Sequence, residues 1–280
     1  MIGFIGLGRM GGAMAAHLVA AGHQVLGLDP SPEARDAARE GGVEIVGSVS
    51  ELRVPIVMSS LPGDAEVEAV YSSDLFRSLE PGALCLDLST IDVGLSQRIA
   101  DVAAGAGHRF LDCPVSGTSV HARAGTLAVM VGGEAAAVEE ARPYLATFST
   151  AVHHVGPNGS GLEMKLITNR LLNAHVVAIA EAILEMEKAG LDSASCIELL
   201  RQGAVPRLLD YKAGPMAARD HDPLFTVDLM AKDLGLADAR RPAGPVGSAA
   251  ASILRQAQDD GWGASDIGAV IEVLVGRDTQ

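Results

Sequence analysis

The sequence predicts an α/β protein in which a doubly wound, mainly parallel sheet is followed by an all-α domain. Three observations predict this arrangement. Short apolar runs alternate with helical patterns through the first half of the 280-residue chain, and a glycine-rich turn joins the first run to the first helical pattern. Beyond about residue 160 only helical patterns remain. Strands that alternate with helices form parallel sheets with right-handed crossovers, which gives the predicted fold class.

The strands of the first half are short apolar runs bounded by glycine, proline or polar turns. We expect strands at residues 1–5, 24–28, 56–59, 84–87, 109–112, 127–131 and 151–154. Helices follow the first two strands, at residues 11–21 and 31–40. Gly22 ends the first helix, and Pro32 lies in the first turn of the second, where proline is favoured. These elements make up the first predicted domain, residues 1–160.

The second half begins with one long helical pattern, residues 162–189, which Gly190 ends. At a rise of about 1.5 Å per residue this helix is roughly 40 Å long, enough to join two domains. Further helices are expected at residues 193–202, 207–218, 226–240, 246–259 and 265–275. Residues 161–280 therefore form an all-helical second domain, which we expect to hold a substrate and to make subunit contacts.

The composition excludes several classes of function. A formal net charge of −14 argues against nucleic acid as a partner, because phosphate contacts need a basic surface. Cys85, Cys113 and Cys196 are far apart and form no Cys-x-x-Cys pair, so neither a disulfide framework nor a metal site is expected. No apolar run approaches the roughly 20 uncharged residues that span a bilayer. The first strand begins at Met1, which leaves no room for a leader, and we expect a cytoplasmic protein.

The turn after the first strand carries Gly6, Gly8 and Gly11 in the order Gly-x-Gly-x-x-Gly. In a dinucleotide site these glycines allow a tight turn, close approach of the pyrophosphate and close packing of helix on strand. The phosphates then meet free N–H groups at the helix N-terminus. The pattern alone is weak evidence in a glycine-rich chain, but a strand precedes it and a helix follows it. We therefore predict a Rossmann domain that binds a nicotinamide dinucleotide, with Leu7, Arg9 and Met10 in the same loop as part of the site.

An acidic residue, Asp29, ends the second predicted strand. A carboxylate at this position accepts hydrogen bonds from the adenosine ribose hydroxyls and repels a 2′-phosphate. Pro30 and Ser31 follow it, rather than an arginine that would bind that phosphate. The sequence therefore favours NAD over NADP as cofactor.

Four segments of the chain resemble the β-hydroxyacid dehydrogenase family, which includes 3-hydroxyisobutyrate dehydrogenases, tartronate semialdehyde reductases and glyoxylate/succinic semialdehyde reductases. The segments are GFIGLGRMGGAMAAHL at the start, DCPVSGTSVHARAGTL in the middle, GPNGSGLEMKLITN near the domain junction and KDLGLA near Lys232. They occur in the family's order, and the resemblance covers essentially the whole chain. Jointly they are specific for the family and much less specific for the substrate.

The junction segment places Lys165 and Asn169 four residues apart in the first turns of the long helix, so both side chains lie on one face. A helix between two domains brings that face to the cleft where a nicotinamide would lie. The resemblance implies that Lys165 is the general acid/base and that Asn169 helps to hold the substrate. A lysine suits this chemistry, because reduction needs a proton at the carbonyl oxygen as hydride reaches carbon. The alternative is a solvated surface lysine, which is the common situation for this residue type.

A turn of small residues, Ser116, Gly117 and Thr118, follows the predicted strand 109–112. Backbone N–H groups and hydroxyls there can cradle a carboxylate. The family often carries a second glycine where this chain has Thr118, so the substrate's substituent stays open. Arg123 is either a carboxylate clamp or a surface group.

Further site residues come from the resemblance alone. It implies that Lys232 contacts the nicotinamide end of the cofactor and that Asp233 supports the catalytic lysine. It also places Leu61, Pro62 and Thr90 beside the cofactor. An exposed helical charge pair is the alternative for Lys232 and Asp233.

The leading hypothesis is an NAD-dependent oxidoreductase that transfers hydride between nicotinamide and a short 3-hydroxy acid or its semialdehyde. Alternatives are an NADPH-preferring glyoxylate/succinic semialdehyde reductase, an imine reductase-like enzyme and a non-catalytic dinucleotide-binding module. A retained Lys165 argues against the last two. Thr168 stands where decarboxylating sugar-acid dehydrogenases carry a histidine, which argues against that class. The apolar stretch 174–184 is too uniformly hydrophobic for one covered stripe, which predicts a homodimer or homotetramer.

Overall fold

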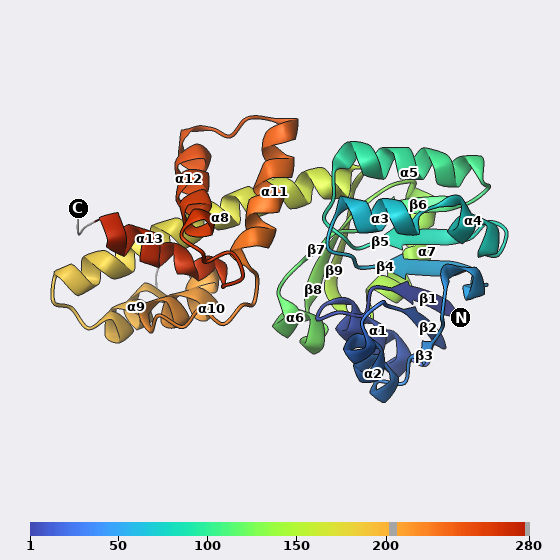
Figure 1. The fold of residues 1–280 in the computed structure, drawn as a ribbon, viewed down its shortest axis with the longest axis horizontal. Coiled ribbons are helices and arrows are strands. Elements are labelled where there is room, and N and C mark those ends of the chain that lie inside the picture. Colours follow the sequence, from blue (N-terminus) through green and yellow to red (C-terminus); the bar gives the residue numbers. More distant parts are fainter. Residues whose placement is uncertain (202–205, 278–280) are drawn as a thin grey trace. The chain divides into compact units, whose positions relative to one another are not determined.

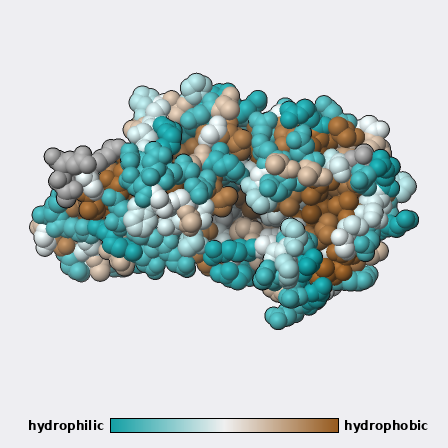
Figure 2. All heavy atoms as spheres, viewed as in Figure 1, coloured by the Kyte–Doolittle hydropathy of each residue, from teal (hydrophilic) through white to brown (hydrophobic). Residues whose placement is uncertain are grey.

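The computed structural model describes residues 1–201 and 206–277 and divides into two compact units, Met1–Lys165 and a second that begins at Leu166 (Figure 1). The first unit contains the sheet and the second is helical. On the face shown in Figure 2, hydrophilic residues predominate over the helical unit, and hydrophobic residues show more widely over the sheet-containing unit.

The first unit is built on a nine-stranded sheet with the order β3-β2-β1-β4-β5-β6-β8-β7, and β9 also pairs with β8. The strands are β1 (Ile2–Ile5), β2 (Val25–Leu28), β3 (Glu44–Ile45), β4 (Ile56–Ser59), β5 (Leu84–Asp87), β6 (Arg109–Asp112), β7 (Val115–Ser116), β8 (Leu127–Gly132) and β9 (Ser149–Gly156). Strands β1 to β6 pair in parallel. Only the pairs of β8 with β6 and β7 are antiparallel among the described strands. The predicted doubly wound, mainly parallel sheet is confirmed.

The helices of the first unit connect these strands. They are α1 (Gly11–Ala20), α2 (Pro32–Glu40), α3 (Asp64–Val70), α4 (Ser73–Ser78), α5 (Val93–Gly105), α6 (Ser119–Ala124) and α7 (Ala135–Leu145), with a 3-10 turn η1 (Val49–Glu51). The crossover from β1 to β2 and that from β4 to β5 run in opposite directions across the sheet. Right-handed connections therefore place α1 and α3 on opposite faces. The strand order reverses between β1 and β4, the point at which open α/β sheets bind ligands.

Local residues explain where these elements begin. Helix α2 begins at Pro32 because the Ser31 side chain accepts a hydrogen bond from Ala34 N at 3.1 Å and so caps it. Every residue of β4 and β5 is buried, as expected for central strands covered on both faces. The short strands β3 and β7 were absent from the sequence prediction, because two-residue strands leave no periodic pattern.

The second unit is all-helical in the residues that the structure describes. Helix α8 (Ser160–Lys188) begins in the first unit and is followed by α9 (Ser193–Arg201), α10 (Pro206–Ala217), α11 (Val227–Arg240), α12 (Pro245–Asp259), η2 (Ile267–Ala269) and α13 (Val270–Arg277). The helix predicted over residues 265–275 is instead η2 followed by α13, because the Asp266 side chain accepts from Gly268 N at 3.0 Å and starts a tight turn. Residue 202 of the predicted helix 193–202 lies outside the described residues.

The middle of α8 is a core element of the second unit. Val176, Ile179, Ala180 and Ile183 are buried in a cluster formed with the later helices. Residues 174–184 therefore need no second subunit to bury them, because the chain's own helices bury most of their apolar side chains. The reason given for a homo-oligomer from this stretch is wrong. The exposed apolar side chains of α8 lie nearer its start, and the homo-oligomer stays a prediction.

By length and composition alone, α8 is the one helix in the described chain that passes as a membrane span. The sequence analysis expected none, because it required a run without charge, whereas α8 includes Lys165. A core helix passes the same test, and 44% of the apolar window is buried inside the protein.

Candidate active site

The glycine-rich loop lies between β1 and α1, and two of its glycines are required by the protein's own packing. Gly6 has φ +88°, and a Cβ there would lie 2.3 Å from the carbonyl oxygen of Ser60. A Cβ at Gly11 would lie 1.9 Å from the carbonyl oxygen of Gly6. Any side chain at either position would push the loop away from β4 or from α1.

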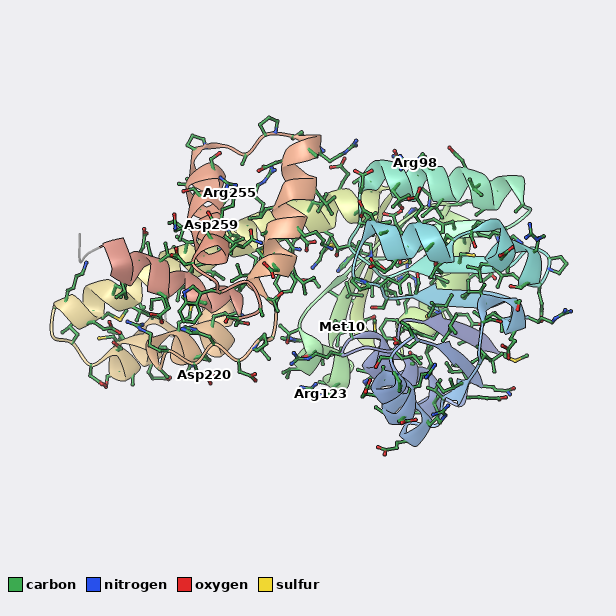
Figure 3. All side chains as sticks on the ribbon, viewed as in Figure 1. Met10, Arg98, Arg123, Asp220, Arg255 and Asp259 are labelled. Carbon is green, nitrogen blue, oxygen red and sulfur yellow. The ribbon has the colours of Figure 1, made fainter. Side chains whose placement is uncertain are left out.

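Gly8 is different, because a Cβ there would meet nothing within 4 Å. The residue is exposed, and the chain itself gives no reason for a glycine. Its missing side chain leaves space beside the first N–H groups of α1, which have no acceptor within the helix. This geometry fits a dinucleotide pyrophosphate. Leu7 is buried in this loop and Arg9 is exposed. Met10, which Figure 3 labels, is half-buried.

Asp29 follows β2 directly and is fixed by two backbone bonds. Its Oδ2 accepts from Leu7 N at 2.6 Å, and its Oδ1 accepts from Ser31 N at 2.8 Å. The carboxylate therefore joins the end of β2 to the glycine-rich loop. A second carboxylate, Glu33, lies in the first turn of α2 and accepts from the Ser31 hydroxyl at 2.7 Å. This corner of the site is acidic, which suits ribose hydroxyls and disfavours a phosphate.

The loop after β4 lies against the glycine-rich loop. Ser60 N donates to the carbonyl of Ile5 at 2.9 Å, and a Cβ on Gly6 would lie 3.0 Å from Leu61 Cδ2. Leu61 N donates to the Ser89 hydroxyl, in the loop after β5, at 2.9 Å. The structure therefore brings Leu61 together with the glycines. Of the other residues predicted here, Pro62 is exposed and Thr90 is half-buried.

The turn at residues 116–118 is held by a contact that the sequence analysis did not anticipate. Gly117 has φ +132°, and a Cβ there would lie 2.7 Å from Leu127 Cδ2. Thr118 caps α6: its N–H donates to His121 Nδ1 at 3.2 Å, and its hydroxyl lies 3.0 Å from the same nitrogen. His121 thus engages the backbone N–H of Thr118, and the one lone pair of Nδ1 cannot also accept fully from the Thr118 hydroxyl. Ser116, which ends β7, is half-buried.

Arg123 lies on α6 and is exposed (Figure 3). Its carbonyl oxygen and that of Ala122 lie 3.0 and 3.1 Å from Nε2 of His17, which belongs to α1. This bond ties the turn-bearing helix to the cofactor helix. No described contact assigns the Arg123 guanidinium to a carboxylate clamp.

The start of α8 is anchored to the sheet by Asp112, the last residue of β6. Asp112 Oδ1 accepts from Gly159 N at 2.7 Å, and Oδ2 accepts from Leu162 N at 3.0 Å. A carboxylate at a helix N-terminus satisfies N–H groups that have no partner within the helix. Lys165 follows one turn later and is only 9% exposed, so it is not the solvated surface lysine of the alternative interpretation.

Asn169 lies one turn beyond Lys165 and is 1% exposed. Its Nδ2 donates to Asp233 Oδ2 of α11 at 2.5 Å. Lys232 Nζ lies 3.1 Å from Asp233 Oδ1. Asp233 is itself buried, so the structure joins three of the predicted residues in one polar cluster rather than an exposed charge pair.

A further polar residue on this face, Asn173, was not predicted from the sequence. It lies one turn beyond Asn169 and is 1% exposed, and its Oδ1 accepts no hydrogen bond from the described residues. The spacing of Lys165, Asn169 and Asn173 at four-residue intervals is the signal that would have found it.

Two family models together match almost the whole chain. The model described as the NAD binding domain of 6-phosphogluconate dehydrogenase matches residues 1–156. The model described as NAD-binding of NADP-dependent 3-hydroxyisobutyrate dehydrogenase matches residues 159–274.

Known proteins match over the full length as well. A probable 3-hydroxyisobutyrate dehydrogenase of Mycobacterium bovis is 37% identical, covering 99% of this chain and 98% of the relative. An NAD-dependent L-serine dehydrogenase of Pseudomonas aeruginosa is 35% identical, covering 96% of each. A solved structure of the Mycobacterium tuberculosis 3-hydroxyisobutyrate dehydrogenase with L-serine superposes with a TM-score of 0.87, at 36% identity over 98% of both chains.

Proposed function

The chain belongs to the β-hydroxyacid dehydrogenase family, and we propose that it is an NAD-dependent dehydrogenase of a short 3-hydroxy acid or of the corresponding semialdehyde. Membership makes it an oxidoreductase that acts on hydroxy acids with a nicotinamide dinucleotide. The substrate, the cofactor preference and the residue roles are the proposal. One observation carries it: Lys165 and Asn169 share a buried face of α8, and Asn169 is bonded to the buried Asp233.

In this proposal Lys165 moves the proton. A nicotinamide bound in this site would supply the hydride chemistry, as acceptor in oxidation and donor in reduction. Lys165 Nζ accepts the hydroxyl proton during oxidation and returns it to the carbonyl oxygen during reduction. Burial supports this role, because a partly desolvated ammonium interacts strongly with charge that develops on oxygen.

Asn169 and Asp233 orient the substrate hydroxyl. With one Nδ2 proton donating to Asp233, the side-chain amide of Asn169 is held in one orientation, and its second Nδ2 proton donates to the substrate oxygen. Asp233 acts through Asn169 and Lys232 and is a positioning residue. Ser116, Gly117 and Thr118 are the proposed carboxylate contacts, with Arg123 as a further cation for that group.

The preference for NAD rests on Asp29 and Glu33. Asp29 is held beside the glycine-rich loop. Glu33, in the first turn of α2, adds a second negative charge. A 2′-phosphate near two carboxylates is repelled, whereas ribose hydroxyls can donate to them. The matching family model takes its name from an NADP-dependent enzyme, so an NADPH-preferring reductase remains the alternative.

The relatives suggest which 3-hydroxy acids to test. One is named for L-serine and another for 3-hydroxyisobutyrate, and these acids share a primary hydroxyl at C3 and a substituent at C2. We propose a substrate of this class. A cytoplasmic location and a homodimer or homotetramer complete the proposal.

The test is a panel assay that follows NADH and NADPH by absorbance at steady state. The panel contains 3-hydroxyisobutyrate, L-serine, 3-hydroxypropionate and glycerate for oxidation, and the matching semialdehydes for reduction. A cyclic imine serves as the control for imine reductase activity. The proposal is supported by turnover of a 3-hydroxy acid or semialdehyde with NAD(H). It is overturned if only the imine is reduced, or if NADH binds and no panel member turns over.

A further inference from the structure

A buried carboxylate, Asp87, stands at the C-terminal end of β5 and is 1% exposed. Its Oδ1 accepts from the Ser59 hydroxyl at 2.7 Å, the Ser89 hydroxyl at 2.6 Å and Ser89 N at 3.2 Å. The Tyr71 hydroxyl lies 2.8 Å from Ser59 Oγ. Because Ser59 gives its one proton to Asp87, Tyr71 must be the donor in that contact. The carboxylate therefore fixes the direction of every hydroxyl in the cluster.

Ser89 links Asp87 to the two loops proposed to bind the cofactor, those after β4 and β5. Its hydroxyl donates to Asp87 and accepts from Leu61 N at 2.9 Å. One carboxylate thus joins the loop after β4, which contains Leu61 and Pro62, to the loop after β5, which contains Thr90. Both loops carry residues that the family resemblance places beside the cofactor. Leu61 also lies against Gly6, so the same chain of contacts reaches the glycine-rich loop.

We propose that Asp87 is a positioning residue that holds these two cofactor loops in their binding geometry when it is ionised, so that cofactor affinity falls when Asp87 takes up a proton. This inference rests on the proposed dinucleotide site. A protonated carboxyl is a weaker acceptor and brings a donor of its own. It no longer holds the Ser59 and Ser89 hydroxyl protons together on Oδ1, so Ser89 no longer offers Leu61 N a fixed acceptor.

Burial supports the coupling, because it raises the pKa of Asp87 to about 6, within reach of physiological pH. Four titratable groups surround Asp87. Asp112 on β6 is its register partner and raises the pKa further. Burial raises the pKa of Tyr71, of Cys113 and of Cys85, the last to about 12, so these three stay neutral in the relevant range. Burial also raises the pKa of Asp112, but its hydrogen bonds go to α8 and not to the cofactor loops.

The experiment measures NADH affinity by fluorescence titration of the full-length protein, without substrate, from about pH 5 to about pH 8. The Kd of the wild type is expected to rise about fivefold between about pH 7 and about pH 5, as when binding lowers the pKa of one group by about one unit. Asp87→Asn keeps the shape but cannot ionise, so its Kd should be raised at high pH and should change little with pH. Histidines and Asp112 remain in this variant, so a wild-type pH dependence that survives in it belongs to one of them and overturns the inference.

A second pair of variants tests the relay without altering the charge. Ser89→Ala removes the acceptor of Leu61 N, so it should weaken NADH binding and lessen its pH dependence, because Asp87 reaches Leu61 through this hydroxyl. Ser96→Ala is the matched control, since Ser96 is a buried serine on α5 whose hydroxyl has no hydrogen-bond partner in the described chain. Equal NADH affinity in the Ser89→Ala and Ser96→Ala variants overturns the inference, even if Asp87→Asn fails to fold. A wild type that binds neither NADH nor NADPH instead contradicts the proposed function.

Discussion

Asp87 and Asp112 are register partners at the C-terminal ends of β5 and β6, and their carboxylates bind different parts of the protein. Asp87 accepts from the hydroxyls that order the cofactor loops, whereas Asp112 accepts from the first N–H groups of α8. Lys165 lies in the next turn of that helix. Two adjacent strand ends thus fix the proposed cofactor loops and the start of the proposed catalytic helix.

The stability of the protein should depend on pH through Asp87, whose pKa is raised from an ordinary 3.8 to about 6 by burial. The native state then binds the proton more tightly than the unfolded chain. The stabilisation is complete below about pH 4 and is lost as pH rises through about 6. Asp87→Asn cannot ionise, so its free energy of unfolding should improve relative to wild type by up to roughly 3 kcal/mol over this range. Denaturant unfolding at several pH values measures the difference, and a constant difference would contradict the assignment.

The preference for NAD(H) over NADP(H) should depend on the Asp29 carboxylate. The wild type should prefer NAD(H) over NADP(H) by at least about tenfold in kcat/KM, which corresponds to about 1.4 kcal/mol. Asp29→Asn should narrow that gap, because the neutral amide no longer repels a 2′-phosphate. The variant should also bind both cofactors more weakly, since Asp29 holds Leu7 N of the glycine-rich loop. Steady-state kinetics with both cofactors give the answer, with exposed Glu40→Gln on α2 as a charge-matched control. A wild type that prefers NADPH rejects the role given to Asp29.

Replacing Asn173 should stabilise the protein and, if its amide binds the substrate, impair catalysis. A buried amide oxygen without a partner costs about 1–3 kcal/mol, and an apolar side chain of similar shape removes that cost. Asn173→Leu should therefore raise the melting temperature. If the amide is kept for a polar group of the substrate, KM should rise in the same variant while NADH affinity is unchanged. A variant less stable than wild type, with unaltered KM, would show that the amide has a structural partner instead.

Part of this architecture was readable from the sequence, and the reason is local. Gly6, Gly8 and Gly11 lie within six residues of one another, and the long helix that begins near residue 160 has a continuous pattern. These features need no knowledge of distant contacts. The pairs that complete the site are remote: Leu61 and Ser89 are 28 residues apart, and Asp112 and Leu162 are 50 apart.

Thr118 shows a second limit on what can be predicted from the sequence. Its sequence neighbours predicted an anion-binding turn, and the structure adds a contact with His121, three residues on, whose ring nitrogen lies within hydrogen-bond distance of the Thr118 N–H and hydroxyl. Whether a ring nitrogen caps a helix or points away depends on a side-chain rotamer, which the sequence pattern does not specify. The same holds for Asn173, whose spacing was visible but whose burial was not.

Assembly should depend on the exposed apolar side chains at the start of α8. Met164, Ile167 and Leu171 lie at three- and four-residue intervals and are exposed, Leu171 by 59%. We expect a homodimer or homotetramer that covers this stripe. Light scattering should give a mass of two or four times 28.8 kDa, and Leu171→Glu should lower it. Leu199→Glu, at an exposed leucine on α9, is the control. A wild type near 28.8 kDa at micromolar concentration contradicts the prediction.

The proposed proton transfer makes the sharpest distinction between an enzyme and a binding module. Lys165 lies beyond the glycine-rich loop, so Lys165→Ala should leave NADH affinity nearly unchanged. Its kcat should fall by a factor of about 10² to 10⁴, the usual contribution of a positioned acid or base. Asn169→Ala should raise KM as well as lower kcat, because Asn169 holds the substrate and its loss also removes the hydrogen bond to Asp233 Oδ2. Asp233→Asn should resemble Asn169→Ala more than Lys165→Ala, since Asp233 acts by positioning.

Fluorescence titration of NADH, beside steady-state kinetics on one identified substrate, separates the variants. If Lys165→Ala kept more than about a tenth of the wild-type kcat, the loss would be too small for a general acid, and the role of Lys165 would have to be abandoned.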